Sequence, residues 1–281
     1  MFTNDIQVIV FDLDGTLYED THHFDYYAAQ LEEKVPSRYR FMYRKDYEDV
    51  LSSKHTLRIG CVYDVKNDLI LFIQNKKVDR VYRWNGSRLS QQSLQKLYPT
   101  SIIINLDDML SIGDLWWVPS SIARHYGVSN DESYEAFLNT RDYMMSEQFQ
   151  LNRIQGLKEL LETISSKCKL VLLTNSPERD SEVILSKLGL AHVFHKKIFM
   201  GKKPMMTGER FKEICREFNV SYPNLLSIGD NLVNEIAPAK ELGCSTIYID
   251  PFHIGNETSA DVTVERMTDA IHLLEDYFKQ K

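Results

Sequence analysis

The second half of the chain alternates short apolar runs with amphipathic helical patterns. The apolar runs lie at Lys169–Leu173, Ile198–Met200, Asn224–Ile228 and Thr246–Ile249, and each is followed by a segment with helical spacing. A further run, Ile6–Phe11, lies near the N-terminus. Strands that alternate with helices form parallel sheets with helices packed on both faces. We therefore predict an α/β fold built on a doubly wound parallel sheet.

A long internal segment interrupts this alternation. Three short β-rich runs, separated by turn residues, occupy about 57–84, and helical patterns surround them. They predict a small antiparallel meander inside a mixed α+β insertion. We expect residues 1–20 and 152–281 to form the α/β core domain, and residues 21–151 to form an inserted cap domain.

Composition and charge narrow the class of protein. The formal net charge of −7 argues against nucleic acid or a membrane surface as partner, because such binding favours a basic face. The 4 cysteines show no Cys-x-x-Cys spacing, which is typical of reduced thiols. No basic leader precedes the first apolar run, and no apolar segment reaches the about 20 residues that span a bilayer. We therefore expect a cytoplasmic protein.

Asp12 and Asp14 lie two residues apart in the loop that follows the first strand. Ligands of open α/β sheets bind outside the carboxyl ends of the strands. Two neighbouring carboxylates repel each other unless a cation offsets their charge, and a divalent metal with oxygen ligands is the usual solution. An acidic turn without function is the alternative, since Asp and Gly15 are ordinary turn residues. Partners elsewhere in the chain must decide between the two.

Three more strand ends carry polar residues to the same predicted edge. Thr174, with the main-chain amides of Asn175 and Ser176 at a helix N-terminus, forms an anion site. Either Lys202 or Lys203 supplies a cation after the next strand. The strand after that is followed by Asp230, Asn231, Asn234 and Glu235. Carboxylates, a hydroxyl and a lysine at one edge suit a phosphoryl group that is bound together with a metal ion.

With these residues identified, the chain resembles the haloacid dehalogenase-like (HAD) superfamily. The four segments that carry the resemblance are Asp12-Leu13-Asp14-Gly15-Thr16, Thr174-Asn175, Lys203-Pro204 and Gly229-Asp230-x-x-x-x-Glu235. The resemblance covers the whole α/β domain. In the insertion it is limited to position, because a cap between the first and second motifs is usual in this superfamily.

The resemblance implies roles for the residues at the strand ends. Asp12 would be the nucleophile that forms an aspartyl-phosphate. Asp14 would protonate the leaving oxygen and later activate water. Thr174, Asn175 and Lys203 would bind the phosphoryl oxygens, and Lys203 is favoured over Lys202 because it precedes a proline.

The resemblance also implies a magnesium cofactor. The Asp12 carboxylate, the Asp14 main-chain carbonyl and Asp230 would bind Mg²⁺, and Glu235 and Asn231 would support the site from behind. Glu235 departs from the family pattern, which most often has Asp there, and its longer side chain favours a role toward the metal's waters or Lys203 over direct contact with the metal.

The implied function is magnesium-dependent hydrolysis of a phosphomonoester, with a small phosphorylated metabolite as substrate. Asp14 argues against dehalogenation, since relatives with that chemistry lack this carboxylate. Two alternatives stay open: phosphomutase-type transfer on a sugar phosphate, and a non-catalytic binding protein on the same fold. The β-rich insertion differs from the mostly helical caps of relatives, so the substrate, the role of the meander and the oligomeric state are left open.

Overall fold

The computed structural model describes residues 4–74, 77–105 and 107–280, and these residues form two compact units. The first unit contains the chain up to Asp20 and from Tyr143 onward, and the second contains Thr21–Asp142. The second junction of the expected domains, at residue 152, thus lies a few residues beyond the boundary seen here. Among the described residues, no helix combines the length and the apolar character needed to cross a membrane.

The first unit, here called the core unit, is built on a six-stranded sheet with the order β10-β9-β8-β1-β6-β7, and every pairing for which a register is defined is parallel. The strands are β1 (Val8–Phe11), β6 (Lys169–Leu173), β7 (Lys196–Ile198), β8 (Leu225–Gly229), β9 (Ser245–Ile249) and β10 (Val262–Val264). Together with the helices described below, this confirms the predicted fold class. β10 lies at the edge of the sheet, and we did not predict it.

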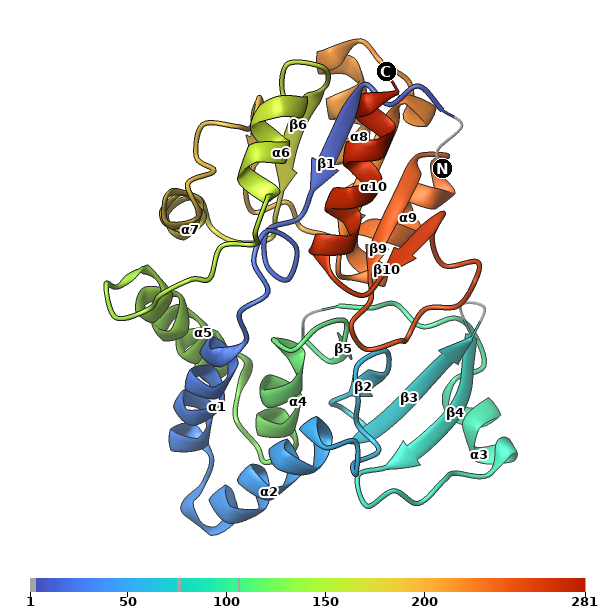
Figure 1. The fold of residues 1–281 in the computed structure, drawn as a ribbon. Coiled ribbons are helices and arrows are strands. Elements are labelled where there is room, and N and C mark those ends of the chain that lie inside the picture. Colours follow the sequence, from blue (N-terminus) through green and yellow to red (C-terminus); the bar gives the residue numbers. More distant parts are fainter. Residues whose placement is uncertain (1–3, 75–76, 106, 281) are drawn as a thin grey trace. The chain divides into compact units, whose positions relative to one another are not determined.

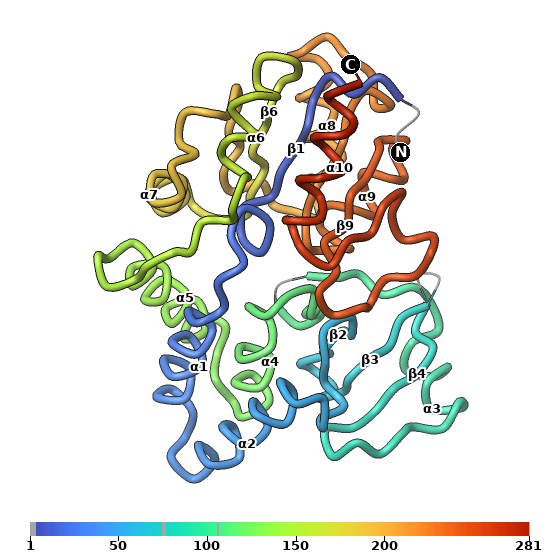
Figure 2. The backbone as a smooth tube through the Cα atoms, in the orientation of Figure 1, coloured from blue at the N-terminus to red at the C-terminus, as the bar shows by residue number. Residues whose placement is uncertain are grey.

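The central strand β1 marks the point where the order of the sheet reverses. Its neighbours are β6 on one side and β8 on the other, and Val8 is in register with Lys169 and Leu225. The chain adds β6 and β7 on one side of β1 and then crosses to β8 on the other side. Figures 1 and 2 show β6 on one side of β1 and β9 on the other. Ligands of such sheets bind at the carboxyl ends of the strands beside this reversal. The loop after β1 is therefore the expected centre of a site.

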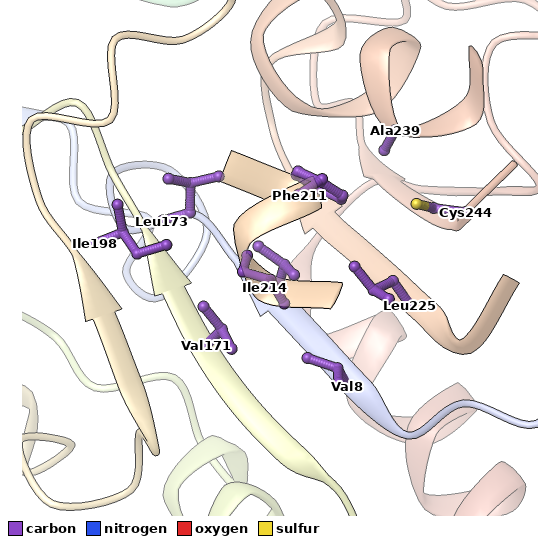
Figure 3. Close-up of a cluster of buried hydrophobic side chains, with 10 residues drawn as sticks. Val8, Val171, Leu173, Ile198, Phe211, Ile214, Leu225, Ala239 and Cys244 are labelled. Carbon is purple, nitrogen blue, oxygen red and sulfur yellow. The ribbon is translucent and has the colours of Figure 1, made fainter. Parts of the chain in front are cut away.

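Helices cover both faces of the sheet. One face carries α6 (Leu157–Ile164) and α10 (Met267–Lys279), and the other carries α8 (Thr207–Phe218) and α9 (Ala237–Glu241) (Figure 1). On the α8 face, Phe211 and Ile214 lie over apolar side chains from β1, β6, β7 and β8 (Figure 3). Burying these side chains fixes the strands, and the strands fix the loops at their carboxyl ends.

The second unit, here called the inserted unit, combines helices with an antiparallel four-stranded sheet of order β4-β3-β2-β5. Its strands are β2 (Val62–Asp64), β3 (Leu69–Gln74), β4 (Lys77–Arg83) and β5 (Met109–Ser111). Its helices are α1 (His22–Lys34), α2 (Arg40–Leu51), α3 (Gln91–Leu97), α4 (Trp117–His125) and α5 (Asn130–Met145), the last of which ends beyond the unit's boundary. Besides the helices named above, the core unit contains α7 (Glu178–Leu188), which follows β6.

The meander differs from the prediction in two respects. A fourth strand, β5, pairs with β2 and comes from a segment for which we predicted partial helix. The first of the three β-rich runs, Leu57–Tyr63, is a strand only at its end, where Val62 and Tyr63 belong to β2. Before that the chain turns: Gly60 has a φ of 91°, and the Cys61 amide donates to the Arg58 carbonyl at 3.2 Å. Apolar composition alone did not distinguish this turn, in which Ile59 and Cys61 are buried, from a strand. Residues 75–76, in one of the predicted turns, lie outside the described residues.

An aromatic and acidic network joins the helices of the inserted unit to its sheet. The rings of Trp84 and His125 stack with their centroids 3.9 Å apart. Asp46 accepts hydrogen bonds from Trp84 Nε1 at 2.8 Å and from the Tyr126 hydroxyl at 2.6 Å. Asp68 lies 2.6 Å from His125 Nδ1. These contacts give the polar groups partners within the unit, as partly buried polar groups require.

Candidate active site

Four loops at the carboxyl end of the parallel sheet carry the residues singled out above. Asp12 and Asp14 follow β1, and the Asp12 main-chain N–H donates to the Ile228 carbonyl of β8 at 3.0 Å. Thr174 follows β6, Lys203 follows β7, and Asp230 follows β8. The parallel arrangement alone accounts for their common edge, because all these strands end in the same direction.

Lys203 lies between two carboxylates. Its Nζ donates to Asp12 Oδ1 and to Glu235 Oε1, both at 2.6 Å, and its side chain is 2% exposed. The neighbouring Lys202 is exposed. Of the two adjacent lysines, Lys203 is therefore the one that extends into the site. A buried ammonium with two carboxylate partners has fixed geometry, which a solvated lysine lacks.

Glu235 is held in place by a short π-helical turn, Leu232–Ile236. Its Oε2 accepts the Asn231 main-chain N–H at 3.0 Å, and a Cβ on Gly229 would lie 2.9 Å from the same oxygen. Asn231 in turn caps the turn, because its Oδ1 accepts the amides of Val233 and Asn234. Single π turns are frequent at functional sites. Glu235 thus faces Lys203, and Asn231 supports Glu235.

Burial and charge shift the pKa values of Asp12, Lys203 and Glu235 in opposite directions. Burial raises the pKa of Glu235 to about 8, and the Lys203 ammonium opposes that rise. Burial likewise raises the pKa of Asp12, which Lys203 opposes and the nearby Asp14 carboxylate reinforces. Burial alone would lower the pKa of Lys203, but Asp12 and Glu235 outweigh it and raise that pKa. We infer that Lys203 stays charged and is shared by two carboxyl groups whose ionisation is disfavoured by burial.

The loop after β6 makes more internal contacts than the sequence suggested. The Asn175 side chain binds the Lys203 main chain, accepting its N–H at 2.7 Å and donating to its carbonyl at 3.0 Å. Thr174 Oγ1 accepts the Ser176 N–H at 3.0 Å. The helix α7 begins only at Glu178, after Pro177. In this structure Asn175 therefore positions Lys203, and the Ser176 amide is already bonded to Thr174.

Asp230 lies directly against the loop that carries Asp12 and Asp14. Gly15 has a φ of +76°, and a Cβ at this position would lie 2.1 Å from Asp230 Oδ2. Only glycine permits so close an approach. No group of three or more His, Cys, Asp or Glu side chains that could hold a metal occurs within the described ranges. Two carboxylates, from Asp12 and Asp230, and the Asp14 carbonyl are nonetheless oxygen donors of the kind that Mg²⁺ takes together with water.

Two side chains at Asp14 were missed as site residues by the sequence analysis. The Tyr18 hydroxyl donates to Asp14 Oδ1, and Ser176 Oγ donates to Asp14 Oδ2 at 2.7 Å. The sequence suggested only the main-chain amide of Ser176. No local pattern marks Tyr18, because its contact depends on how the chain turns after Thr16.

Comparisons with known proteins bear on the family and the fold of the chain. The family model described as haloacid dehalogenase-like hydrolase matches residues 6–243 of the chain. No curated protein matches the sequence significantly.

Several solved structures share the fold. The HAD-hydrolase YfnB from Bacillus subtilis, bound to magnesium, has a TM-score of 0.54 and 15% identity over 96% of this chain and 98% of its own. A predicted phosphoglycolate phosphatase from Haemophilus somnus has a TM-score of 0.54 and 16% identity over 96% and 99%. The L-2-haloacid dehalogenase RSc1362 has a TM-score of 0.51 and 14% identity over 96% and 99%. At such identities the likeness concerns the fold alone, and one of these proteins is named as a phosphatase and another as a dehalogenase.

Proposed function

Because the chain belongs to the haloacid dehalogenase-like hydrolases, we propose that it is a magnesium-dependent phosphatase that hydrolyses a small phosphorylated metabolite through an aspartyl-phosphate. The observation that carries the proposal is a second carboxylate, Asp14, held by hydrogen bonds two residues from the Asp12 carboxylate. A halide leaves without a proton, whereas the alkoxide of an ester needs one. Asp14 therefore has a use in ester hydrolysis that it lacks in dehalogenation.

In the first step an Asp12 carboxylate oxygen attacks phosphorus, and the bond between phosphorus and the ester oxygen breaks. Asp14 gives its proton to the departing oxygen, so that an alcohol leaves. Lys203, bonded to Asp12 at 2.6 Å, balances negative charge near the phosphoryl group. Thr174, buried at the adjacent strand end, supplies a hydroxyl for a phosphoryl oxygen.

In the second step water attacks the phosphorus of the aspartyl-phosphate, and Asp14 accepts the proton of that water. Inorganic phosphate leaves, and the Asp12 carboxylate is restored. The residues that would hold Mg²⁺ are Asp12, Asp230 and the Asp14 main-chain carbonyl. Glu235 and Asn231 would support these ligands without being the main ligands themselves. The bound ion would offset the charge of the phosphoryl oxygens. The close approach of Asp230 to Gly15 supports this set, because it brings the two loops together.

The test is hydrolysis of p-nitrophenyl phosphate and a panel of phosphomonoesters, with magnesium and with a chelator. We expect metal-dependent phosphate release by the wild type and none above background by Asp12→Asn. Asp79→Asn, an exposed carboxylate of the inserted unit, is the matched control and should keep full activity. The preferred ester will identify the substrate class.

Two results would contradict the proposal. Undiminished hydrolysis by Asp12→Asn would show that Asp12 is not the nucleophile. Absence of turnover for every ester, in a protein that still binds magnesium, would favour a phosphomutase or a binding protein instead. Transfer of phosphate within a sugar phosphate, detected by product analysis, would identify the mutase.

A further inference from the structure

The Asp14 carboxylate has a hydroxyl donor on each of its two oxygens. Tyr18 donates to Oδ1 and Ser176 to Oδ2. Tyr18 is 1% exposed and Ser176 is 7% exposed, so both hydroxyls are sheltered from bulk water. Ser176 lies 162 residues from Asp14 in the chain and comes from the loop after β6. The two donors therefore reach Asp14 from separate segments.

This arrangement fixes the plane of the Asp14 carboxyl group. Rotation about the last side-chain bond of Asp is soft and does not define an orientation by itself. A donor on each oxygen removes that freedom. The main chain contributes as well, because Asp14 and Tyr18 form an isolated β-bridge that sets the distance between them. Hydrogen bonds to an ionised carboxylate are stronger than bonds between neutral groups.

We propose that Tyr18 and Ser176 are positioning residues that aim the Asp14 carboxyl group at the ester oxygen and at the attacking water; this inference rests on the proposed phosphatase function. A hydroxyl group both donates and accepts, so each can serve Asp14 in its ionised and in its protonated form. A carboxylate has about four lone-pair sites, and two hydroxyls occupy two of them. These two hydrogen bonds hold the carboxyl group while it exchanges a proton with the leaving oxygen or with water.

The proposal predicts an effect that depends on the leaving group. Protonation by Asp14 matters most when the departing oxygen is strongly basic, as in alkyl esters, and least for p-nitrophenolate, which leaves readily without a proton. Loss of either hydroxyl should therefore slow the hydrolysis of alkyl esters far more than that of p-nitrophenyl phosphate. A residue that only supports the fold would affect all esters alike.

The experiment measures kcat/KM for Tyr18→Phe and Ser176→Ala against aryl and alkyl phosphate esters of increasing leaving-group basicity. We expect each variant to lose about tenfold in kcat/KM for alkyl esters, less than the roughly 100- to 10,000-fold that proton transfer by a placed side chain contributes, because Asp14 itself remains; for p-nitrophenyl phosphate we expect little loss. Tyr277→Phe is the matched control. The Tyr277 hydroxyl forms hydrogen bonds with the main chain of Asn4 and Ile6, before β1 begins. Its loss should leave the dependence of kcat/KM on leaving-group basicity unchanged.

The outcomes separate this inference from the proposed function. A uniform loss over all esters, or no loss, in both folded variants would overturn the positioning role while leaving the phosphatase assignment intact. A wild type that hydrolyses no ester would overturn both. Ser176→Ala provides an independent variant if Tyr18→Phe does not fold, because Ser176 comes from a separate loop and donates to the other oxygen of Asp14.

Discussion

The core unit and the inserted unit both bury carboxylates, but with different partners. In the inserted unit, Asp64 is fully buried and accepts hydrogen bonds from the Asn67 amide at 3.0 Å, Asn67 Nδ2 at 2.8 Å and the Tyr98 hydroxyl at 2.6 Å. These donors are neutral. In the core unit, Asp12 and Glu235 instead share the ammonium of Lys203.

The difference separates a structural carboxylate from one that is prepared for a ligand. Three neutral donors satisfy Asp64 within its own unit and leave little reason for another group to approach. When Asp12, Glu235 and Lys203 are all ionised, the single ammonium leaves one negative charge uncompensated. A metal ion and a phosphoryl group bring charges of both signs, so they can enter the core network without leaving an unpaired charge behind.

The largest effect is expected when the cation is removed from the core network. Lys203→Met leaves Asp12 and Glu235 without their shared ammonium, and breaking a buried ion pair by removing one partner costs about 3–5 kcal/mol. We expect a fall of that order in the free energy of unfolding, measured with urea, and loss of phosphate release. Lys202→Met, which changes an exposed lysine, is the control. Unchanged stability in Lys203→Met would show that the trio is not coupled.

The second prediction compares two glycines with positive φ, one in each unit. A side chain in the left-handed region costs about 1–2 kcal/mol, which applies to Gly15→Ala and Gly86→Ala alike. At Gly86 the nearest atom to a new Cβ is Thr56 Oγ1 at 3.3 Å, whereas at Gly15 it is Asp230 Oδ2 at 2.1 Å. Displacing Asp230 should lower kcat/KM about 100-fold, as small misplacements in active sites do.

The magnesium dependence of activity sharpens this comparison. Gly15→Ala should require more magnesium for half-maximal activity, because Asp230 is one of the proposed ligands. Gly86→Ala should keep the wild-type requirement. Equal kinetic behaviour of the two variants would mean that Asp230 is not needed where the structure places it.

The fold class could be predicted from the sequence because parallel strands impose a pattern that is visible locally. Buried strands appear as apolar runs, and their carboxyl ends share one edge, which is why Asp12, Thr174 and Asp230 were sought together. The short strands β5 and β10 were missed. Each has only three residues, so the pattern is too short to distinguish a strand from a turn.

The partners of individual side chains could not be predicted in the same way. Asn175 binds the main chain of Lys203, and Tyr18 and Ser176 meet at Asp14, through contacts that depend on how separate loops approach each other. Nothing in the sequence around Tyr18 distinguishes it from a packing residue. The resemblance favoured Lys203 over Lys202 because a proline follows it, but the two adjacent positions alone do not reveal which side chain extends into the site.

A smaller effect, confined to stability, is expected in the inserted unit. Asp64→Ala removes the acceptor of three neutral donors. Asn67 is exposed, so water can take over its two hydrogen bonds, and the main cost is that of the half-buried Tyr98 hydroxyl, about 1–3 kcal/mol. We expect a lower free energy of unfolding and an unchanged kcat/KM for the folded protein. Asp79→Ala, at an exposed position of the same sheet, should change the stability little. Lost activity without lost stability would give Asp64 a role in chemistry.

The smallest effect concerns the pH dependence of the inserted unit. Burial lowers the pKa of His55, which Asp46 and Asp49 oppose and His125 and Lys45 reinforce. The ring packs against Trp84 with centroids 4.9 Å apart.

Protonation of His55 also has a direct structural cost, since its Nδ1 accepts the Leu57 N–H at 3.0 Å. As the pH falls below the ordinary value of 6.5, the unfolded chain takes up this proton before the folded chain does, so stability is lost until the folded pKa is reached. His55→Asn keeps an acceptor for the amide two residues on and does not titrate. Urea unfolding followed by tryptophan fluorescence reports on the inserted unit, because Trp84, Trp116 and Trp117 all belong to it. Relative to the wild type, the variant should gain stability at pH 5 compared with pH 7.5, and a constant difference would show that His55 does not contribute to the acid sensitivity of this unit.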